Sequence, residues 1–154
     1  MFDVSARIAN TLVDMGVQPG DRVAVQVPKS IEATMLYLAT VRAGAIFLPL
    51  NTGYTVSEVQ YFLENATPSL FVCDPAKQAE LEPLSQELGI RLETLGVWKS
   101  HDESAGSLSD AALEASTEFE NIERSGDDLG AILYTSGTTG RSKGAMLSLS
   151  LIHI

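Results

Sequence analysis

Residues 22–50 read RVAVQVPKSIEATMLYLATVRAGAIFLPL, and this stretch is the strongest indication of the fold class. Its first part, Arg22–Pro28, alternates valine with other residues until proline ends it, which is typical of a β-strand. Ser30 can then cap a helix, and Gly44 can end that helix. Residues 45–48 follow as a second short apolar strand. This order of strand, helix and strand with short connections predicts an α/β fold.

The same alternation extends to both sides of this stretch. Val4, Ile8 and Leu12 are spaced four residues apart, which predicts a helix that precedes it. Thr55 and Glu58 form a capping box, which predicts the start of the next helix. Further strands are expected at 69–73, 90–95 and 129–134, and further helices at 76–88 and 108–118. We therefore expect one α/β domain with a mainly parallel sheet flanked by helices.

Composition excludes several classes of protein. The chain has 154 residues, of which 45% are hydrophobic and 19% charged, so it is not disordered as a whole. A single cysteine, Cys73, excludes an internal disulfide framework, and we expect a buried, inert thiol in a cytoplasmic protein. The net charge of −10 argues against a nucleic acid or an anionic membrane as the partner. No apolar run has the length of a signal peptide or a membrane span.

The sign of the charge reverses near the end of the chain. Residues 76–128 carry four basic and thirteen acidic side chains, whereas residues 129–154 carry two basic ones and no acidic one. The positive stretch includes residues 134–144, YTSGTTGRSKG. Its glycines let the backbone turn so that N–H groups can bind an anion, its hydroxyls can donate further hydrogen bonds, and Lys143 adds a cation. This combination predicts a phosphate-binding loop.

Two common nucleotide-binding patterns do not fit this loop. Only two residues separate Gly137 from Gly140, and Lys143 precedes a glycine, so the loop does not match GxxxxGK[ST]. It does not match the dinucleotide pattern GxGxxG either. A run of Ser, Thr and Gly can also be an ordinary solvated loop, but the strand before it and the Arg-Ser-Lys-Gly after it favour phosphate binding.

Residues 134–144 resemble the phosphate-loop signature of the AMP-forming, adenylate-forming enzymes, which include acyl-CoA synthetases, luciferases and peptide-synthetase adenylation domains. The lead-in strand Asp127–Leu133 also resembles that family. Shorter segments at 20–24, 43–45, 48–51 and 73–75 follow in the family's order. The resemblance extends to about Ser148, and it implies part of the N-terminal α/β domain of such an enzyme.

The resemblance also implies roles for seven residues. They would bind the β- and γ-phosphates of ATP, which enters with Mg²⁺: Thr135, Ser136, Gly137, Thr138, Thr139, Gly140 and Lys143. In the family a substrate carboxylate attacks the α-phosphate to form an acyl-adenylate and pyrophosphate, and coenzyme A then displaces AMP to form a thioester. The resemblance thus implies an acid–CoA ligase whose loop holds and neutralises the leaving pyrophosphate.

Two segments suggest a subgroup. Most members of the family have proline before the loop lysine, whereas this chain has Ser142 after Arg141. The segments Arg141–Ser148 and Leu36–Gly44 look most like the malonyl-CoA synthetase branch. This resemblance favours a malonate-type carboxylic acid as the substrate.

The resemblance implies that the chain is a fragment. In the family, the substrate pocket, the magnesium-binding acid and the catalytic lysine would all lie beyond Ser148. We therefore expect residues 1–148 to be a partial AMP-binding domain that is inactive alone and contains no catalytic and no metal-binding residue. Residues 149–154, LSLIHI, match a translated transposon-end sequencing adapter, so we expect a foreign tail there.

Two other hypotheses stay open at the level of sequence. One is a stand-alone α/β module that binds a nucleotide or phosphate without catalysis. The other is a truncated chain that folds poorly, because half a sheet exposes strand edges. His101 lies beside Asp102 and Glu103, but two histidines without a cysteine cluster argue against a metal site.

Overall fold

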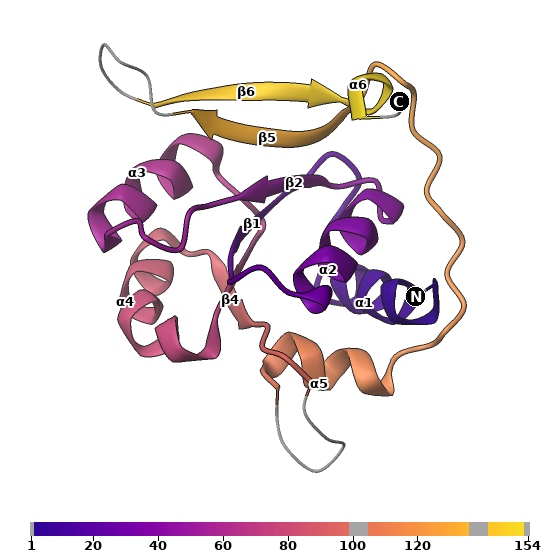
Figure 1. Ribbon diagram of the computed structural model, residues 1–154, viewed down its shortest axis with the longest axis horizontal. Helices are drawn as coiled ribbons and strands as arrows, with labels where there is room; N and C mark the ends of the chain where they lie inside the picture. Colours follow the sequence, from indigo (N-terminus) through magenta and orange to yellow (C-terminus); the bar gives the residue numbers. More distant parts are fainter. Residues whose placement is uncertain (1, 99–104, 136–141, 153–154) are drawn as a thin grey trace.

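The computed structural model describes residues 2–98, 105–135 and 142–152. Figure 1 shows one sheet with helices packed on it. The sheet has six strands in the order β4-β3-β1-β2-β5-β6. Four neighbouring pairs are parallel and only the pair of β5 with β6 is antiparallel, which confirms the expected α/β fold with a mainly parallel sheet. The strands are β1 Arg22–Gln26, β2 Ile46–Pro49, β3 Leu70–Cys73, β4 Arg91–Thr94, β5 Leu129–Thr135 and β6 Lys143–Ser148.

Helices cover both faces of the sheet, and the sheet separates the core into two apolar layers. Val23 and Val25 of β1 pack among helices α1, α2 and α5, whereas Ala24 points to the layer that α3 and α4 cover. All three side chains are buried, as expected for a parallel strand between two helical layers. The helices are α1 Phe2–Asp14, α2 Ile31–Arg42, α3 Val56–Ala66, α4 Gln78–Leu88, α5 Ser107–Glu114 and α6 Leu149–Ile152, with a short 3₁₀ turn, η1, at Pro75–Lys77.

Local signals in the sequence explain where two central helices begin. The Ser30 hydroxyl accepts a hydrogen bond from the Ala33 N–H at 3.0 Å, which caps α2 as expected. At the start of α3, the Glu58 carboxylate accepts from the Thr55 N–H at 2.8 Å, and the Thr55 hydroxyl accepts from the Glu58 N–H at 3.4 Å. These two reciprocal bonds form the predicted capping box.

The structure differs from the sequence-based expectation at α5 and β6, and also at α6, which was not expected. The helix expected at 108–118 ends at Glu114, and the Ala115 backbone is extended. Strand β6 was not predicted, because a six-residue segment with glycine and few β-branched residues has no strong strand pattern of its own. Pairing with β5 supplies the hydrogen bonds that make residues 143–148 a strand.

Glycine is required on β6 where this strand passes Tyr134. Gly144 pairs with Tyr134 in the antiparallel register. A Cβ atom at Gly144 would lie 3.1 Å from the Ile132 Cγ2 atom and 3.4 Å from the Tyr134 Cε1 atom. Larger side chains are therefore excluded unless these neighbours move.

Helix α6 follows β6 directly. The Leu149 N–H donates to the Asp128 carbonyl and the Ser150 N–H to the Gly126 carbonyl, both at 2.8 Å. Within the described residues, these bonds join the first half of the segment 149–154 to the turn that precedes β5. The foreign origin of that segment stays a prediction.

No helix among the residues described has the length and apolar character that crossing a membrane requires.

We predict that Glu58→Gln makes the stability of the chain less dependent on pH. Hydrogen bonds from the Thr55 N–H and hydroxyl lower the pKa of Glu58. A carboxyl group with a lowered pKa stabilises the fold at pH values above its ordinary pKa of 4.5. This stabilisation is lost as the pH falls through the lowered pKa. Thermal unfolding followed by circular dichroism should show a lower midpoint for Glu58→Gln at neutral pH, and the difference from wild type should shrink in acid. An equal difference at both pH values would contradict the assignment.

We also predict that Gly144→Val destabilises the fold by about 1–3 kcal/mol, because the added methyl groups would overlap Ile132 and Tyr134. The measurement is the free energy of unfolding in urea. Ala145→Val is the matched control, because Ala145 is exposed and points to the opposite face of the same strand. Equal stability of the two variants would show that the contact at Gly144 does not restrict its side chain.

Candidate phosphate-binding site

The two ends of the predicted phosphate loop lie side by side in the structure. Thr135 ends β5 and Lys143 begins β6, and these two residues are direct partners in the antiparallel register. The Thr135 hydroxyl donates to the Lys143 carbonyl at 3.4 Å. Of the seven predicted site residues, the structure therefore brings Thr135 and Lys143 together. The other five lie outside the described residues: Ser136, Gly137, Thr138, Thr139 and Gly140.

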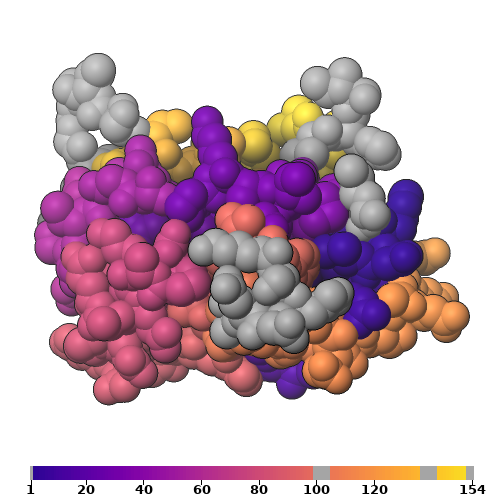
Figure 2. Space-filling model, turned by 60° about the horizontal axis from the view of Figure 1, so that its bottom comes forward, coloured from indigo at the N-terminus to yellow at the C-terminus, as the bar shows by residue number. Residues whose placement is uncertain are grey.

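The position of these two residues in the sheet suits a ligand site. Thr135 lies at the carboxyl end of β5, and ligands of open α/β sheets bind beyond the carboxyl ends of the strands. Figures 1 and 2 both place the β5–β6 hairpin at one edge of the molecule, away from α4 and α5. The site is thus open to solvent on the side of the hairpin.

The charge at this edge favours an anion. Thr135 and Lys143 are both exposed. The ion pairs between described residues are Lys77–Glu80, Arg91–Glu93 and Arg124–Asp128, and none of them includes Lys143. The ammonium group of Lys143 is therefore not neutralised by any carboxylate in the described part of the chain, and it can pair with a phosphate.

Aromatic side chains support the β5 end of the loop. The ring of Tyr134 packs on Phe62 with a centroid distance of 4.6 Å, and the ring of Tyr54 packs on the same Phe62 with a centroid distance of 4.9 Å. Burial raises the pKa of Tyr134, and its neighbour Tyr61 raises it further, whereas Arg22 lowers it. The Tyr134 hydroxyl therefore stays protonated at neutral pH and can donate a hydrogen bond.

Helix α3 contacts both ends of the loop through two residues that sequence reasoning did not single out. The Tyr134 hydroxyl donates to the Asn65 Oδ1 atom at 2.6 Å. The Tyr61 hydroxyl donates to the Ser142 carbonyl at 3.2 Å. The four-residue spacing of Tyr61 and Asn65 places both on one face of α3. The sequence contains this spacing, but it carries no signal that this face of α3 meets the loop.

Other candidates from the sequence do not form a second site. Cys73 is fully buried, which confirms the expected buried thiol, and burial raises its pKa to about 12, which agrees with the expectation that it is inert. Across residues 2–98, 105–135 and 142–152, no three His, Cys, Asp or Glu side chains lie close enough together to hold a metal ion. His101 with its acidic neighbours lies outside the described residues.

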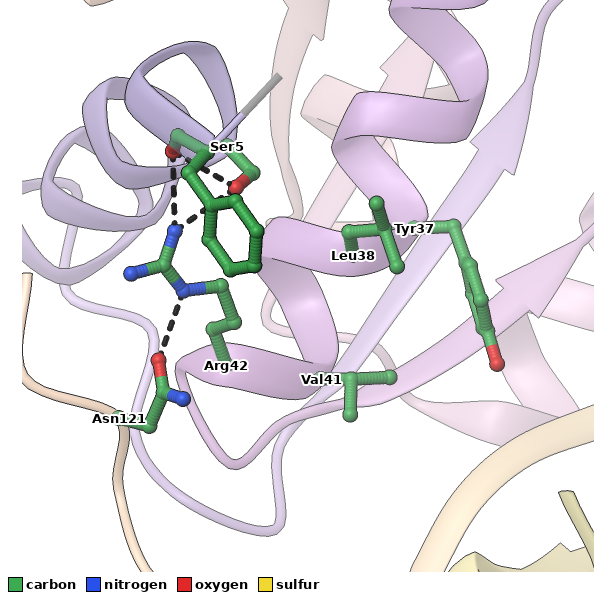
Figure 3. A pocket seen from close by; sticks show the side chains of 7 residues that line it. Ser5, Tyr37, Leu38, Val41, Arg42 and Asn121 are labelled. Carbon is green, nitrogen blue, oxygen red and sulfur yellow. Dashed lines mark hydrogen bonds between the residues drawn. The ribbon is translucent and has the colours of Figure 1, made fainter. Parts of the chain in front are cut away.

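A cavity of about 250 Å³ between α1 and α2 is separate from the loop, because none of its lining residues comes from β5 or β6. Figure 3 shows the Arg42 guanidinium at its edge, bonded to α1 and to Asn121. Arg42 donates to the Phe2 carbonyl at 3.1 Å, to the Ser5 hydroxyl at 2.7 Å and to the Asn121 Oδ1 atom at 2.7 Å. These bonds join α1, α2 and the segment before β5, so Arg42 has a structural role.

Comparison with known proteins identifies relatives along nearly the whole chain. The oxalate–CoA ligase of Arabidopsis thaliana is 32% identical over 151 residues, which are 96% of this chain and 29% of that protein. The medium-chain fatty-acid–CoA ligase of Escherichia coli strain K12 is 33% identical over 147 residues, which are 92% of this chain and 26% of that protein. The chain thus spans between a quarter and a third of the length of these two relatives.

Solved structures agree with the sequence comparison. The crystal structure of apo MatB from Rhodopseudomonas palustris matches with a TM-score of 0.87 and 54% identity, and the match covers 96% of this chain and 28% of MatB. A crystal structure of the same protein with bound ATP matches with the same TM-score and 55% identity. The N-terminal domain of FACL13 from Mycobacterium tuberculosis matches with a TM-score of 0.80 and 27% identity, over 98% of this chain and 37% of that one.

A model of one protein family, described as AMP-binding enzyme, matches residues 1–153. This agrees with the expectation from the loop signature and with the fold of the MatB structures. The homologues named above are acyl-CoA ligases, and this chain matches only an N-terminal part of their length. The chain therefore belongs to the AMP-binding enzyme family.

Proposed function

We propose that this chain is the nucleotide-phosphate-binding part of an ATP-dependent acid–CoA ligase. The observation that carries the proposal is the pairing of Thr135 with Lys143 at the ends of the loop, in a chain of the AMP-binding enzyme family. Their pairing fixes the span of the intervening loop, so that backbone N–H groups, hydroxyls and the ammonium group can converge on one anion. The binding of ATP by MatB, which is 55% identical to this chain, supports ATP as the nucleotide.

The proposed site consists of the seven loop residues that the sequence singles out. They hold the β- and γ-phosphates of ATP: Thr135, Ser136, Gly137, Thr138, Thr139, Gly140 and Lys143. The two described members fit this role, because the hydroxyl and ammonium groups are exposed and no carboxylate lies between Asp128 and the end of the chain. The loop thus offers donors and a positive charge to the leaving pyrophosphate as negative charge develops there.

The whole reaction belongs to the longer protein. A carboxylate oxygen of the substrate attacks the α-phosphorus of ATP, the bond to the bridging oxygen breaks, and pyrophosphate leaves. The sulfur of coenzyme A then attacks the acyl carbon, loses its proton, and AMP leaves with the bonding electron pair. Mg²⁺ bound to ATP would neutralise phosphate charge. The resemblance implies that its acidic ligand, like the catalytic residues, would lie beyond Ser148. The role of residues 1–148 is to bind and orient the phosphates.

Malonate is the proposed acid. The similarity to MatB favours malonate, and so does the resemblance of residues 36–44 and 141–148 to the malonyl-CoA synthetase branch. Identity to MatB is 54%, whereas it is 32% and 33% to the oxalate and medium-chain fatty-acid ligases. The single buried thiol, Cys73, supports a cytoplasmic location, where cysteines stay reduced.

The alternative function is a stand-alone module that binds nucleotide or phosphate without catalysis. It shares the loop and differs only in the absence of the adenylation step. The extent of the coding sequence beyond residue 148 separates the two: a continuous frame through a C-terminal lysine domain supports the ligase. The same experiment tests whether residues 149–154 are a foreign tail, as we propose.

Lys143→Met tests the phosphate site in the 154-residue chain. We expect the variant to bind Mg·ATP about ten- to a hundredfold more weakly than wild type, because a charged hydrogen-bond donor to phosphate is lost. Affinity is measured by isothermal titration calorimetry. The control is Arg91→Met, because Arg91 is exposed, pairs with Glu93 and begins β4, at the edge of the sheet opposite the carboxyl ends of the parallel strands. Equal affinity of folded wild type and Lys143→Met would remove Lys143 from the site.

The complete protein tests the choice of acid. We expect it to exchange labelled pyrophosphate into ATP faster with malonate than with oxalate or octanoate, because the favoured acid forms the adenylate. Exchange that depends on octanoate and not on malonate would refute malonate and leave the ligase activity intact. No exchange with any carboxylic acid would favour the binding module.

A further inference from the structure

We infer that helix α3 positions the phosphate loop, with Tyr61 and Asn65 as positioning residues that hold the two ends of the loop in register. The inference rests on the proposed function of the loop, and it concerns residues outside the loop signature. Tyr61 contacts the backbone carbonyl of Ser142 and Asn65 contacts the hydroxyl of Tyr134, so both act on residues at the two ends of the loop.

The two contacts lie on opposite ends of the loop. Asn65 accepts from the Tyr134 hydroxyl, 2.6 Å away, one residue before Thr135 at the end of β5. Tyr61 donates to the Ser142 carbonyl, 3.2 Å away, one residue before Lys143 at the start of β6. One rigid helix therefore contacts both the residue that enters the loop and the residue that leaves it.

Register matters because the loop lysine lies on a strand. Side chains alternate between the faces of a sheet, so a slip of one residue between β5 and β6 would turn Lys143 to the opposite face. Lys143 would then no longer lie beside Thr135. Contacts outside the strand pair help to distinguish one offset from the next, and the contacts of Tyr61 with Ser142 and of Asn65 with Tyr134 are of this kind.

The face of the hairpin that meets α3 adds a second restriction. Gly144 lies opposite Tyr134, and a Cβ there would already be 3.1 Å from Ile132 and 3.4 Å from the tyrosine ring. A slip would bring the side chain of Lys143 or Ala145 to this position. The packing thus disfavours the same shifted registers that the hydrogen bonds from α3 disfavour.

The hydroxyl groups, and not only the rings, are required for this role. Tyr54 also packs on Phe62, with a centroid distance of 4.9 Å, as Tyr134 does at 4.6 Å. Among the described residues, the hydroxyls of Tyr61 and Tyr134 make hydrogen bonds and that of Tyr54 makes none. Removing the Tyr54 hydroxyl therefore keeps the aromatic packing and all contacts to the loop, which makes Tyr54→Phe a matched control.

The experiment compares the variants Tyr61→Phe, Tyr134→Phe and Tyr54→Phe in the full 154-residue chain. The first readout is hydrogen–deuterium exchange of peptides that cover 129–148 and, as an internal reference, 22–49. We expect faster exchange of the hairpin peptides in Tyr61→Phe and Tyr134→Phe, with exchange of 22–49 unchanged. Tyr54→Phe should match wild type in both regions. A purely structural role would instead speed exchange throughout the sheet.

The second readout is the affinity for pyrophosphate with Mg²⁺, measured by calorimetry. We expect Tyr61→Phe and Tyr134→Phe each to bind roughly two- to tenfold more weakly, the range for one lost neutral hydrogen bond. We expect the double variant Asn65→Leu/Tyr134→Phe to bind pyrophosphate no more weakly than Asn65→Leu or Tyr134→Phe alone, because each substitution removes the same hydrogen bond.

The outcomes separate the inference from the proposed function. Hairpin exchange and pyrophosphate affinity of Tyr61→Phe and Tyr134→Phe equal to those of Tyr54→Phe would overturn the positioning role, even if Lys143→Met loses binding. Faster hairpin exchange in these variants would support positioning by α3 even if wild type does not bind pyrophosphate, and that absence of binding would refute the phosphate site alone.

Discussion

Burial of strand β1 on both faces is the constraint on which the other elements depend. Val23 and Val25 need one apolar layer and Ala24 needs another, and neither layer can be left open to water without losing the core. Helices α1, α2 and α5 supply the first layer, and α3 and α4 supply the second. Because α3 must cover this second face, it lies where the end of β5 and the start of β6 meet, and the support of the loop follows from the packing of the core.

The loop region combines an open surface with a fixed base. Thr135 and Lys143 are exposed to solvent, whereas the neighbouring Tyr134 packs on the buried ring of Phe62. The acidic residues of the chain are concentrated between 76 and 128, so the positive charge of the loop is not opposed within its own segment. In the proposed site, the positive charge of Lys143 supplies the attraction for an anion.

The chain corresponds to an N-terminal part of an AMP-binding enzyme. The part described here matches ATP-bound MatB over 96% of its length and covers 28% of that protein. The proposed contribution of residues 1–148 is to hold the phosphates and to neutralise the leaving group.

Features that depend on neighbouring residues could be predicted from the sequence. Ser30, Thr55 and Glu58 cap their helices through bonds within four residues, and the alternation of Arg22–Gln26 is a property of that segment alone. The Gly-rich loop carries its chemistry in adjacent residues, so its role could be proposed without a structure. Strand β6 could not be found in this way, because its hydrogen bonds come from β5 across the loop. The contacts of Tyr61 and Asn65 join residues 81 and 69 positions apart, and no local pattern encodes such pairs. Local propensity and spacing thus specify the elements and the loop, whereas the burial of both sheet faces brings α3 to the loop and creates its support.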